Sequence, residues 1–226
     1  MQIEIHNLTK IYSEKRGLLP INLDVEKGEL IAVIGHNGAG KSTLLKMLAS
    51  WLLPDSGEVL VDGINLKNRL AIVRKVGFVP ETPNLFDFFS VGYNLKIFAR
   101  LFQVPFMRME EIMKEFNLLP YRNNKIHVLS KGLRQRVSIG RALLADPPVL
   151  LFDEPTSGID FDMTKEIYRL LKDFHASGKT IIFTSHRPEE IKTLATRIIV
   201  LHQGSLIFDG SPQTYFQSDL HEKLYL

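Results

Sequence analysis

The sequence contains no cysteine among its 226 residues. A disulfide framework and a thiolate metal site are therefore both excluded, and a reducing compartment such as the cytosol is expected. Long apolar runs are also missing, because charges interrupt every hydrophobic segment before it reaches the ~18 residues that a membrane-spanning helix needs. The first residues alternate between apolar and polar and contain no basic segment followed by an apolar one, so no secretory signal is expected.

Neither sign of charge predominates. The chain has 28 Lys and Arg against 25 Asp and Glu, a net charge of +3, and these residues are scattered. The small basic excess is therefore expected to be ordinary solvated surface, and no nucleic-acid partner is expected. A hydrophobic content of 45% and a charged content of 23% are typical of a globular protein. The length fits one large domain, or one domain with an inserted lobe.

Strand-like and helix-like segments alternate along the chain. Strands are expected at residues 3–5, 21–25, 30–34, 58–61, 149–152, 180–184 and 197–201. Helices are expected at residues 41–50, 110–116, 131–144, 164–177 and 188–194, and the apolar spacing of Leu85, Phe89, Tyr93, Leu95, Ile97, Phe98, Leu101 and Phe102 is also helical. This order predicts an α/β fold whose later strands, being continuously apolar, are buried on both faces of a parallel sheet. Residues 86–119 are expected to form an all-helical insert.

The most specific local pattern lies at residues 35–42, which read Gly-His-Asn-Gly-Ala-Gly-Lys-Ser and match G-x-x-x-x-G-K-[S/T]. The loop follows one expected strand and precedes an expected helix, which is the context that a phosphate-binding loop requires. Glycines let backbone N–H groups approach phosphate oxygens, and the helix N-terminus adds partial positive charge. Lys41 is expected to reach the β- and γ-phosphates of a nucleoside triphosphate, and Ser42 to bind Mg²⁺.

Two carboxylates follow the buried strand expected at residues 149–152. Asp153 would lie at the carboxyl end of that strand, where open α/β sheets bind ligands, and is the candidate metal-side carboxylate. Glu154 comes next and is the candidate general base for an attacking water. The alternative is that one of these two residues only caps the following helix.

Residues 129–136, Leu-Ser-Lys-Gly-Leu-Arg-Gln-Arg, resemble the signature motif of the ATP-binding cassette (ABC) ATPases, usually LSGGQ followed by a Gln-Arg pair. The resemblance extends over nearly the whole chain. In the family's order, Tyr12 is similar to the aromatic A-loop residue, residues 35–42 to the Walker A loop, Glu81 to the Q-loop position, Asp153 and Glu154 to the Walker B pair, residues 157–160 to the D-loop and His186 to the switch histidine.

The resemblance implies a fold and a reaction. The fold is a P-loop NTPase core with an antiparallel β subdomain and an inserted α-helical subdomain. A single nucleotide-binding domain would span residues 1–226, with the core in 1–84 and 145–226 and the helical subdomain, which contains the signature, at about 85–144. The reaction is Mg²⁺-dependent hydrolysis of ATP. Two copies would close head to tail, so that the signature of one completes the ATP site of the other.

The resemblance also implies three sets of site residues. The catalytic set is Glu154, His186 and Glu81, and the metal set is Ser42, Glu81 and Asp153. The nucleotide-binding set is Tyr12, Gly35, Asn37, Gly38, Ala39, Gly40, Lys41, Ser42, Thr43, Ser130, Gly132 and Asp160. From the residues alone, Tyr12 could stack on adenine or pack on the surface, and Ser130 could bind a phosphate or only cap its helix. His186 follows an apolar strand and has both a donor and an acceptor to offer a γ-phosphate.

Three positions depart from the usual family pattern. Lys131 stands where Gly is usual, Leu133 where Gln is usual, and Glu81 where Gln is usual; all three resemble a branch of bacterial exporters for lipid, antibiotic, sodium or peptide-type substrates. Lys131 could add a cation near the partner's nucleotide or could point to solvent. Leu133 cannot form a hydrogen bond, and Glu81 keeps an oxygen for Mg²⁺ or water but lacks the amide donor.

Phenylalanine is concentrated between Phe78 and Phe116, which contain eight of the 14 in the chain. Most are expected to form the core of the helical insert. Exposed aromatics near residues 86–89 and Tyr93 would form a docking patch, because in the family this lobe receives the transmembrane permease subunits. Such a subunit would lie at the cytoplasmic side of the membrane, as a peripheral protein.

Two function classes fit the resemblance. The first is the ATPase subunit of an ABC transporter, expected to be an exporter. The second is a soluble ABC ATPase that acts in DNA repair, translation or cofactor assembly. A DNA-end protein would need a long heptad insertion before Ser130, which is missing, and a ribosomal factor would contain two cassettes in one chain. A P-loop kinase would leave Ser130, Asp160 and His186 unexplained. The transporter subunit is therefore the favoured prediction.

Overall fold

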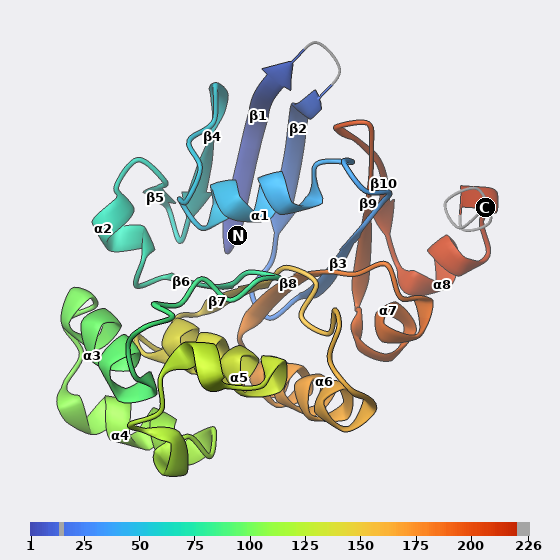
Figure 1. Ribbon diagram of the computed structural model, residues 1–226. Helices are drawn as coiled ribbons and strands as arrows, with labels where there is room; N and C mark the ends of the chain where they lie inside the picture. The colour runs from blue at the N-terminus through green and yellow to red at the C-terminus, as the bar shows by residue number, and fades with distance from the viewer. Residues whose placement is uncertain (14–15, 221–226) are drawn as a thin grey trace.

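A six-stranded sheet runs through the middle of the computed structural model, which describes residues 1–13 and 16–220 (Figure 1). The strand order is β10-β9-β3-β8-β7-β6. The strands are β3 (Leu30–Ile34), β6 (Val76–Val79), β7 (Val149–Phe152), β8 (Thr180–Thr184), β9 (Arg197–His202) and β10 (Ser205–Gly210). β10 pairs antiparallel with β9, and all the other pairings are parallel. The expected strands at 30–34, 149–152, 180–184 and 197–201 are confirmed, whereas β6 and β10 were not predicted.

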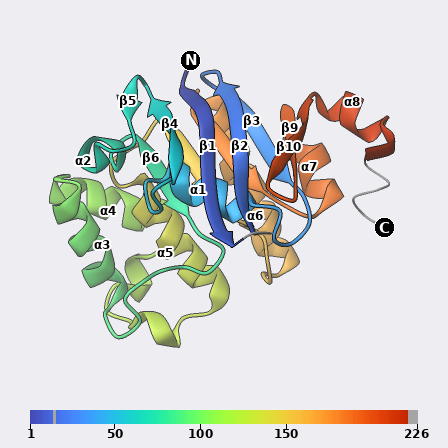
Figure 2. The same ribbon diagram turned by 90° about the horizontal axis from the view of Figure 1, so that it is seen from above.

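A second, antiparallel sheet lies on one side of the first, with α1 (Lys41–Leu48) between them (Figures 1 and 2). Its order is β2-β1-β4-β5, formed by β1 (Ile3–Ser13), β2 (Arg16–Val25), β4 (Ser56–Val61) and β5 (Ile64–Asn65). The strands expected at 3–5, 21–25 and 58–61 lie inside β1, β2 and β4. β1 and β2 extend well beyond the predicted segments.

The other helices lie mainly on the opposite side of the six-stranded sheet (Figure 1). Those beneath it are α5 (Lys131–Leu143), α6 (Phe161–Ala176) and α7 (Pro188–Leu194), and α3 (Val91–Leu101) and α4 (Phe106–Glu115) lie beside α5. The shorter helices are α2 (Arg69–Ile72), α8 (Pro212–Phe216) and the 3₁₀ turns η1 (Leu119–Tyr121) and η2 (Ile126–Val128). Within the described residues, none of the helices combines the length and apolar character needed to cross a bilayer.

The helical assignment of Leu85 and Phe89 is wrong. α3 begins only at Val91, because Ser90 caps it with an extended backbone and accepts a hydrogen bond from the Tyr93 amide. The preceding loop is held instead by the buried side chain of Asn94. Its Oδ1 accepts from the Phe86 amide at 2.8 Å, and its Nδ2 donates to the Phe86 and Ser90 carbonyls at 3.1 and 3.0 Å.

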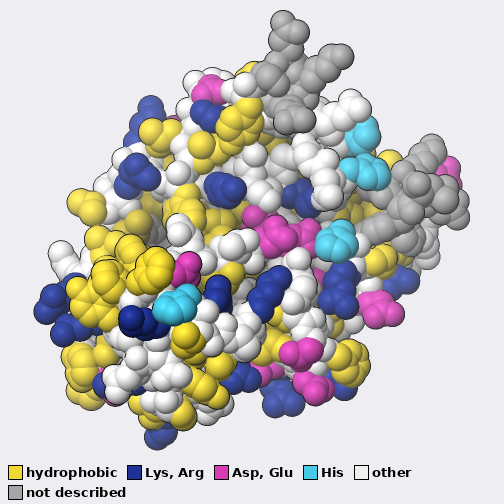
Figure 3. Space-filling model, viewed as in Figure 1, with side chains coloured by type: hydrophobic (Ala, Val, Ile, Leu, Met, Phe, Trp, Pro, Cys, Tyr) yellow, Lys and Arg dark blue, Asp and Glu magenta, His cyan; other side chains and the backbone are white. Residues whose placement is uncertain are grey.

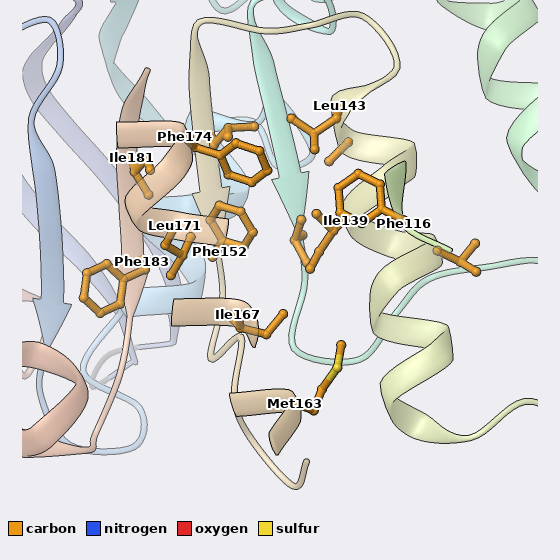
Figure 4. Packing of buried hydrophobic residues seen from close by; sticks show 14 of the residues in the cluster. Phe116, Ile139, Leu143, Phe152, Met163, Ile167, Leu171, Phe174, Ile181 and Phe183 are labelled. Atoms are coloured by element: carbon orange, nitrogen blue, oxygen red, sulfur yellow. The ribbon is translucent and has the colours of Figure 1, made fainter. Parts of the chain in front are cut away.

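Both faces of the central sheet are buried, which explains why its strands are continuously apolar. Leu150 and Phe152 of β7 face the cluster beneath the sheet, and Val149 and Leu151 face the cluster that includes α1 and the antiparallel sheet. In Figure 4, Phe152 and Phe183 from the sheet lie against Ile167 and Leu171 of α6, from the helix layer below. The sheet is thereby fixed on both sides, and the loops at its carboxyl edge have a rigid base.

α5 approaches the edge strand β6 very closely. A Cβ atom at Gly77 would lie only 2.7 Å from the Ala142 carbonyl oxygen, so no larger residue fits there without displacing backbone. β6 leads to Glu81 at its carboxyl end, and α5 begins just after Ser130. The strand and the helix that approach two of the predicted site residues are therefore in direct backbone contact.

Candidate active site

The predicted phosphate-binding loop connects β3 to α1. Gly40 caps α1 with a φ of 105°, and no side chain caps the helix. A Cβ at Gly40 would lie 2.9 Å from Leu18 Cδ1, and one at Gly35, where φ is 148°, would lie 2.1 Å from the Leu201 carbonyl oxygen. Only glycine fits these two positions without strain. The loop is thus compact, and the first-turn amides of α1 have no competing side-chain acceptor.

Lys41 is folded back over this loop. Its Nζ donates to the carbonyl oxygens of Gly35 at 2.7 Å and His36 at 3.2 Å, and the residue is only 7% exposed. Burial lowers the pKa of Lys41, and the carboxylates of Glu154, Asp153 and Glu81 oppose that shift. A buried cation bonded to neutral carbonyls is a strong potential partner for an anionic phosphate.

Ser42 and Asp153 meet at the carboxyl ends of β3 and β7. Ser42 Oγ donates to Asp153 Oδ1 at 3.0 Å, and Thr184 Oγ1 donates to the same oxygen at 2.8 Å. Thr184 Oγ1 also accepts from the Glu154 amide at 2.8 Å. Asp153 therefore does not cap a helix, and that alternative is wrong for it. Sequence reasoning missed Thr184, because only the pairing of β8 with β7 brings its hydroxyl to Asp153.

Glu154 and His186 face each other. His186 Nδ1 lies 2.9 Å from Glu154 Oε2, and Glu154 has a φ of 48°, in the left-handed region that is unusual for a glutamate. Burial raises the pKa of Glu154 above its ordinary value, while His186 and Lys41 oppose the shift. A carboxyl whose pKa lies nearer neutrality is better suited to accept a proton from water. Glu154 also caps no helix, because the α6 cap is Asp160.

These residues surround a cavity of about 820 Å³. Its lining consists of Tyr12, Gly17, Asn37, Gly38, Gly40, Lys41, Ser42, Thr43, Glu81, Glu154 and His186. All but one of these are predicted site residues. Gly17 was missed, although a lone glycine in a strand signals a close approach of backbone or ligand. The predicted loop residues Gly35 and Ala39 lie outside the lining, and so does the buried metal-side candidate Asp153. Ala39 is buried in the core, and Gly35 packs under the loop against Leu201.

Tyr12 and Glu81 both belong to the cavity lining. Tyr12 is 56% exposed on β1, and the Lys10 ammonium lies 6.0 Å from the centroid of its ring. Glu81, after β6, accepts a hydrogen bond from Ser157 Oγ at 3.2 Å. This bond joins the Q-loop position to the segment that follows Glu154. Tyr12 is consequently available for stacking, and the Glu81 carboxylate is already engaged by the D-loop segment.

Ser130, Gly132 and Asp160 line a different pocket. It has a volume of about 500 Å³ and shares no lining residue with the first cavity. Ser130 Oγ accepts from the Leu133 amide at 3.3 Å, and Asp160 Oδ1 accepts from the Met163 amide at 2.8 Å, so each caps a long helix. The predicted nucleotide-binding residues are therefore divided between two separate pockets of one chain.

Two of the three departures from the family pattern, Lys131 and Leu133, line this second pocket, whereas Glu81 lines the first cavity. The Lys131 ammonium lies against Gly158, because a Cβ built there would be 2.5 Å from Lys131 Nζ. Leu133 is half-buried and packs against the core cluster beneath the sheet. Lys131 thus follows the surface of the D-loop, and Leu133 substitutes packing for the hydrogen bonding of the usual glutamine.

Sequence comparison identifies the family. The chain matches the ABC transporter family over residues 18–157. The ABC transporter ATP-binding protein NatA of Bacillus subtilis (strain 168) is 36% identical over 211 residues, which cover 90% of this chain and 85% of that protein. Nod factor export ATP-binding protein I of Rhizobium etli is 35% identical over 215 residues, which cover 93% of this chain and 68% of that protein.

Solved structures agree. The ATP-binding cassette MJ0796, a dimer in a post-hydrolysis state bound to ADP and Pi, superposes with a TM-score of 0.84 at 29% identity, covering 92% of this chain and 98% of that one. An ATP-binding subunit of an ABC transporter superposes with a TM-score of 0.88 at 26% identity, covering 100% and 98%. The fold and the first cavity define a P-loop ATPase of the α/β class, as expected. The chain belongs to the ABC transporter family, as an ATP-binding subunit that hydrolyses ATP to power transport.

Proposed function

We propose that ATP binds in the first cavity with its phosphates on the loop of residues 35–42 and its adenine on Tyr12. Lys41 would exchange its loop carbonyls for phosphate oxygens, and Glu154 would accept a proton from the attacking water. The observation that carries this proposal is the contact between Glu154 and His186, 2.9 Å long, beside the loop. His186 would orient both the water and the γ-phosphate, and Glu81 would assist as a further carboxylate in the cavity lining.

The donor set beside the loop fits Mg²⁺. Ser42 Oγ and Asp153 Oδ1 are hard oxygen donors, and Glu81 supplies a further carboxylate at the cavity lining. Mg²⁺ binds through one or two carboxylates together with phosphates and waters, so a complete protein cage is not needed. Ser42, Asp153 and Glu81 would hold the ion, which when bound would neutralise phosphate charge.

We infer that a second molecule completes the site. Ser130, Gly132 and Asp160 line a pocket that has no lining residue in common with the first cavity. Ser130 accepts from the Leu133 amide at the start of α5, and the N-terminus of such a helix is suited to a γ-phosphate. A copy of this chain, or a related ATPase subunit, would present its second pocket to the first cavity of its partner. The dimeric state of the similar cassette MJ0796 supports this arrangement.

The helical elements offer a surface for a permease subunit. Hydrophobic side chains gather over α3 on the face shown in Figure 3. Phe86, Phe88, Phe89 and Tyr93, here called the aromatic patch, are each 45% to 79% exposed. Asn94 fixes the loop that holds three of them. We propose that transmembrane permease subunits dock on this patch and keep the chain at the cytoplasmic side of the membrane. The export named for the Rhizobium relative supports export as the direction.

The experiment that tests the assignment compares Glu154→Gln with the parent chain. The variant keeps the shape of the side chain but cannot accept the proton, so the hydrolysis rate should fall about a hundredfold or more while ATP binding persists. Dimers should accumulate on ATP and be visible by size-exclusion chromatography. Glu115→Gln, an exposed carboxylate on α4, is the matched control. Parental hydrolysis by Glu154→Gln would remove Glu154 as the base.

A further inference from the structure

Glu190, in the first turn of α7, is a buried carboxylate that none of the roles above uses. It is only 1% exposed, whereas its neighbour Glu189 is exposed. Thr156 Oγ1 lies 3.2 Å from Glu190 Oε1 and 3.1 Å from Oε2, and Ser185 Oγ donates to Oε2 at 2.6 Å. A carboxylate is costly to bury unless such bonds compensate for lost water. Its place therefore calls for an explanation beyond packing.

The two hydroxyls belong to the two segments that present the proposed catalytic pair. Thr156 follows Glu154 by two residues, and Ser185 directly precedes His186. Ser185 Oγ also accepts from the Arg187 amide at 3.0 Å, which leaves its proton directed at Glu190. His186 Nδ1 and Glu154 Oε2 are themselves 2.9 Å apart. Hydrogen bonds and short stretches of backbone therefore form a closed ring, which runs from Glu154 through Thr156, Glu190, Ser185 and His186 back to Glu154. Glu190 joins the two halves of this ring through the buried hydroxyls of Thr156 and Ser185.

We propose that Glu190 is a positioning residue that holds Glu154 and His186 in the relative orientation that hydrolysis requires. This inference rests on the roles proposed for that pair. The His186 side chain is 63% exposed and is joined to Glu154 by one bond, and a solvent-exposed pair by itself orders side chains weakly. Glu190 anchors the backbone of both loops one or two residues from that pair, away from water. Glu190 is not part of the cavity lining, so it acts on the geometry of the pair and not on the nucleotide.

Steady-state kinetics of Glu190→Ala test the inference. We expect kcat to fall about tenfold while KM and the Kd for a fluorescent ATP analogue stay within about twofold. In a His186→Ala background the same substitution should lower kcat by less than about twofold, because its effect passes through the histidine. Glu190→Gln can still bridge two hydroxyls and should restore kcat to within about threefold of the parent. Glu189→Ala is the matched control and should be unchanged.

Several results would overturn the inference: a parental kcat in folded Glu190→Ala, the same fold-loss with and without His186, or a Glu190→Gln variant as slow as Glu190→Ala. If Glu190→Ala does not fold, Ser185→Ala and Thr156→Val each remove one donor, and a parental kcat in both overturns it equally. Failure of the proposed site is distinguished by Glu154→Gln. If that variant hydrolyses ATP normally the site assignment fails, whereas if it is inactive and the Glu190 variants are normal, only this inference fails.

Discussion

Ser42 and Asp153 are 111 residues apart in the chain, yet the Ser42 hydroxyl donates to the Asp153 carboxylate at 3.0 Å. The contact joins the start of α1 to the carboxyl end of β7, and Thr184 of β8 donates to the same oxygen at 2.8 Å. Three separate segments thus converge on one buried oxygen at the edge of the cavity. The loop that is proposed to hold the phosphates is fixed to the sheet at the point where the metal ion is expected.

Lys41→Ala is expected to weaken ATP binding by about a hundredfold. The substitution removes a buried cation that would pair with phosphate, an interaction stronger than a neutral hydrogen bond. Isothermal titration calorimetry with ATP and Mg²⁺ measures the loss. Lys46→Ala, which removes an exposed lysine from the same helix, controls for net charge and should bind like the parent. Equal affinity in the two variants would contradict the phosphate assignment.

Gly132→Ala should leave the folding of the isolated chain intact while impairing ATP hydrolysis by the proposed dimer. A Cβ at Gly132 would meet Met163 Cγ at 3.6 Å, an ordinary van der Waals distance, so the isolated chain has room for it. The melting temperature should therefore stay within about 2 °C of the parent, a stability change below about 1 kcal/mol. A partner's nucleotide pressed against α5 would not have this room, so ATP hydrolysis should fall at least about tenfold. Parental hydrolysis would argue that no ligand approaches this surface closely.

The pH dependence of stability should reveal the environment of Glu154. Because burial raises its pKa in the folded chain, its contribution to stability is present below the ordinary glutamate pKa and is lost as the pH rises through the folded value. At pH 8 the ionised carboxylate thus penalises the folded state. Glu154→Gln, which is always neutral, should unfold about 2 °C higher than the parent at pH 8. The difference should vanish near pH 4, and a lower melting temperature at pH 8 would contradict the direction of the shift.

Phe88→Ser tests the aromatic patch. The side chain is 79% exposed, so its loss should leave the melting temperature of the chain unchanged. If a permease subunit buries it, stimulation of ATP hydrolysis by the membrane subunits that co-purify with the parent should drop at least about threefold. Ile207→Ser, at an exposed position on β10 away from the patch, is the control and should keep full stimulation. Equal stimulation of both variants would place the docking surface elsewhere.

Much of the fold could be predicted because the signals were local. A strand followed by a glycine-rich loop and a helix places Lys41 and Ser42, and Ser130 caps α5 as its sequence position indicated. The apolar run at β7 placed Asp153 at the carboxyl edge of the sheet. β6 was missed because Gly77 interrupts its short apolar run, whereas β7 is four residues of uninterrupted apolar sequence. The loop before α3 was misassigned because the spacing of its aromatic residues is typical of a helix. In the structure it is irregular, and the Asn94 side chain holds it by hydrogen bonds to the Phe86 backbone.

Interactions between distant segments lay beyond sequence reasoning. Thr184 carries no motif of its own, and only the pairing of β8 with β7 brings its hydroxyl to Asp153. The burial of Glu190 could not be predicted for a similar reason. In the sequence, Glu189 and Glu190 are two acidic residues in the first turn of a helix, where both are favourable when exposed to solvent. Packing of α7 against the strand ends is what buries one and exposes the other.

The missing side chain at Gly77 has a mechanical consequence. With no side chain there, the backbone of β6 lies so close to the Ala142 carbonyl that even a single methyl group would wedge the strand away from α5. Ser130 directly precedes α5 and Glu81 follows β6 by two residues, so such a wedge would disturb the approaches to both pockets at once.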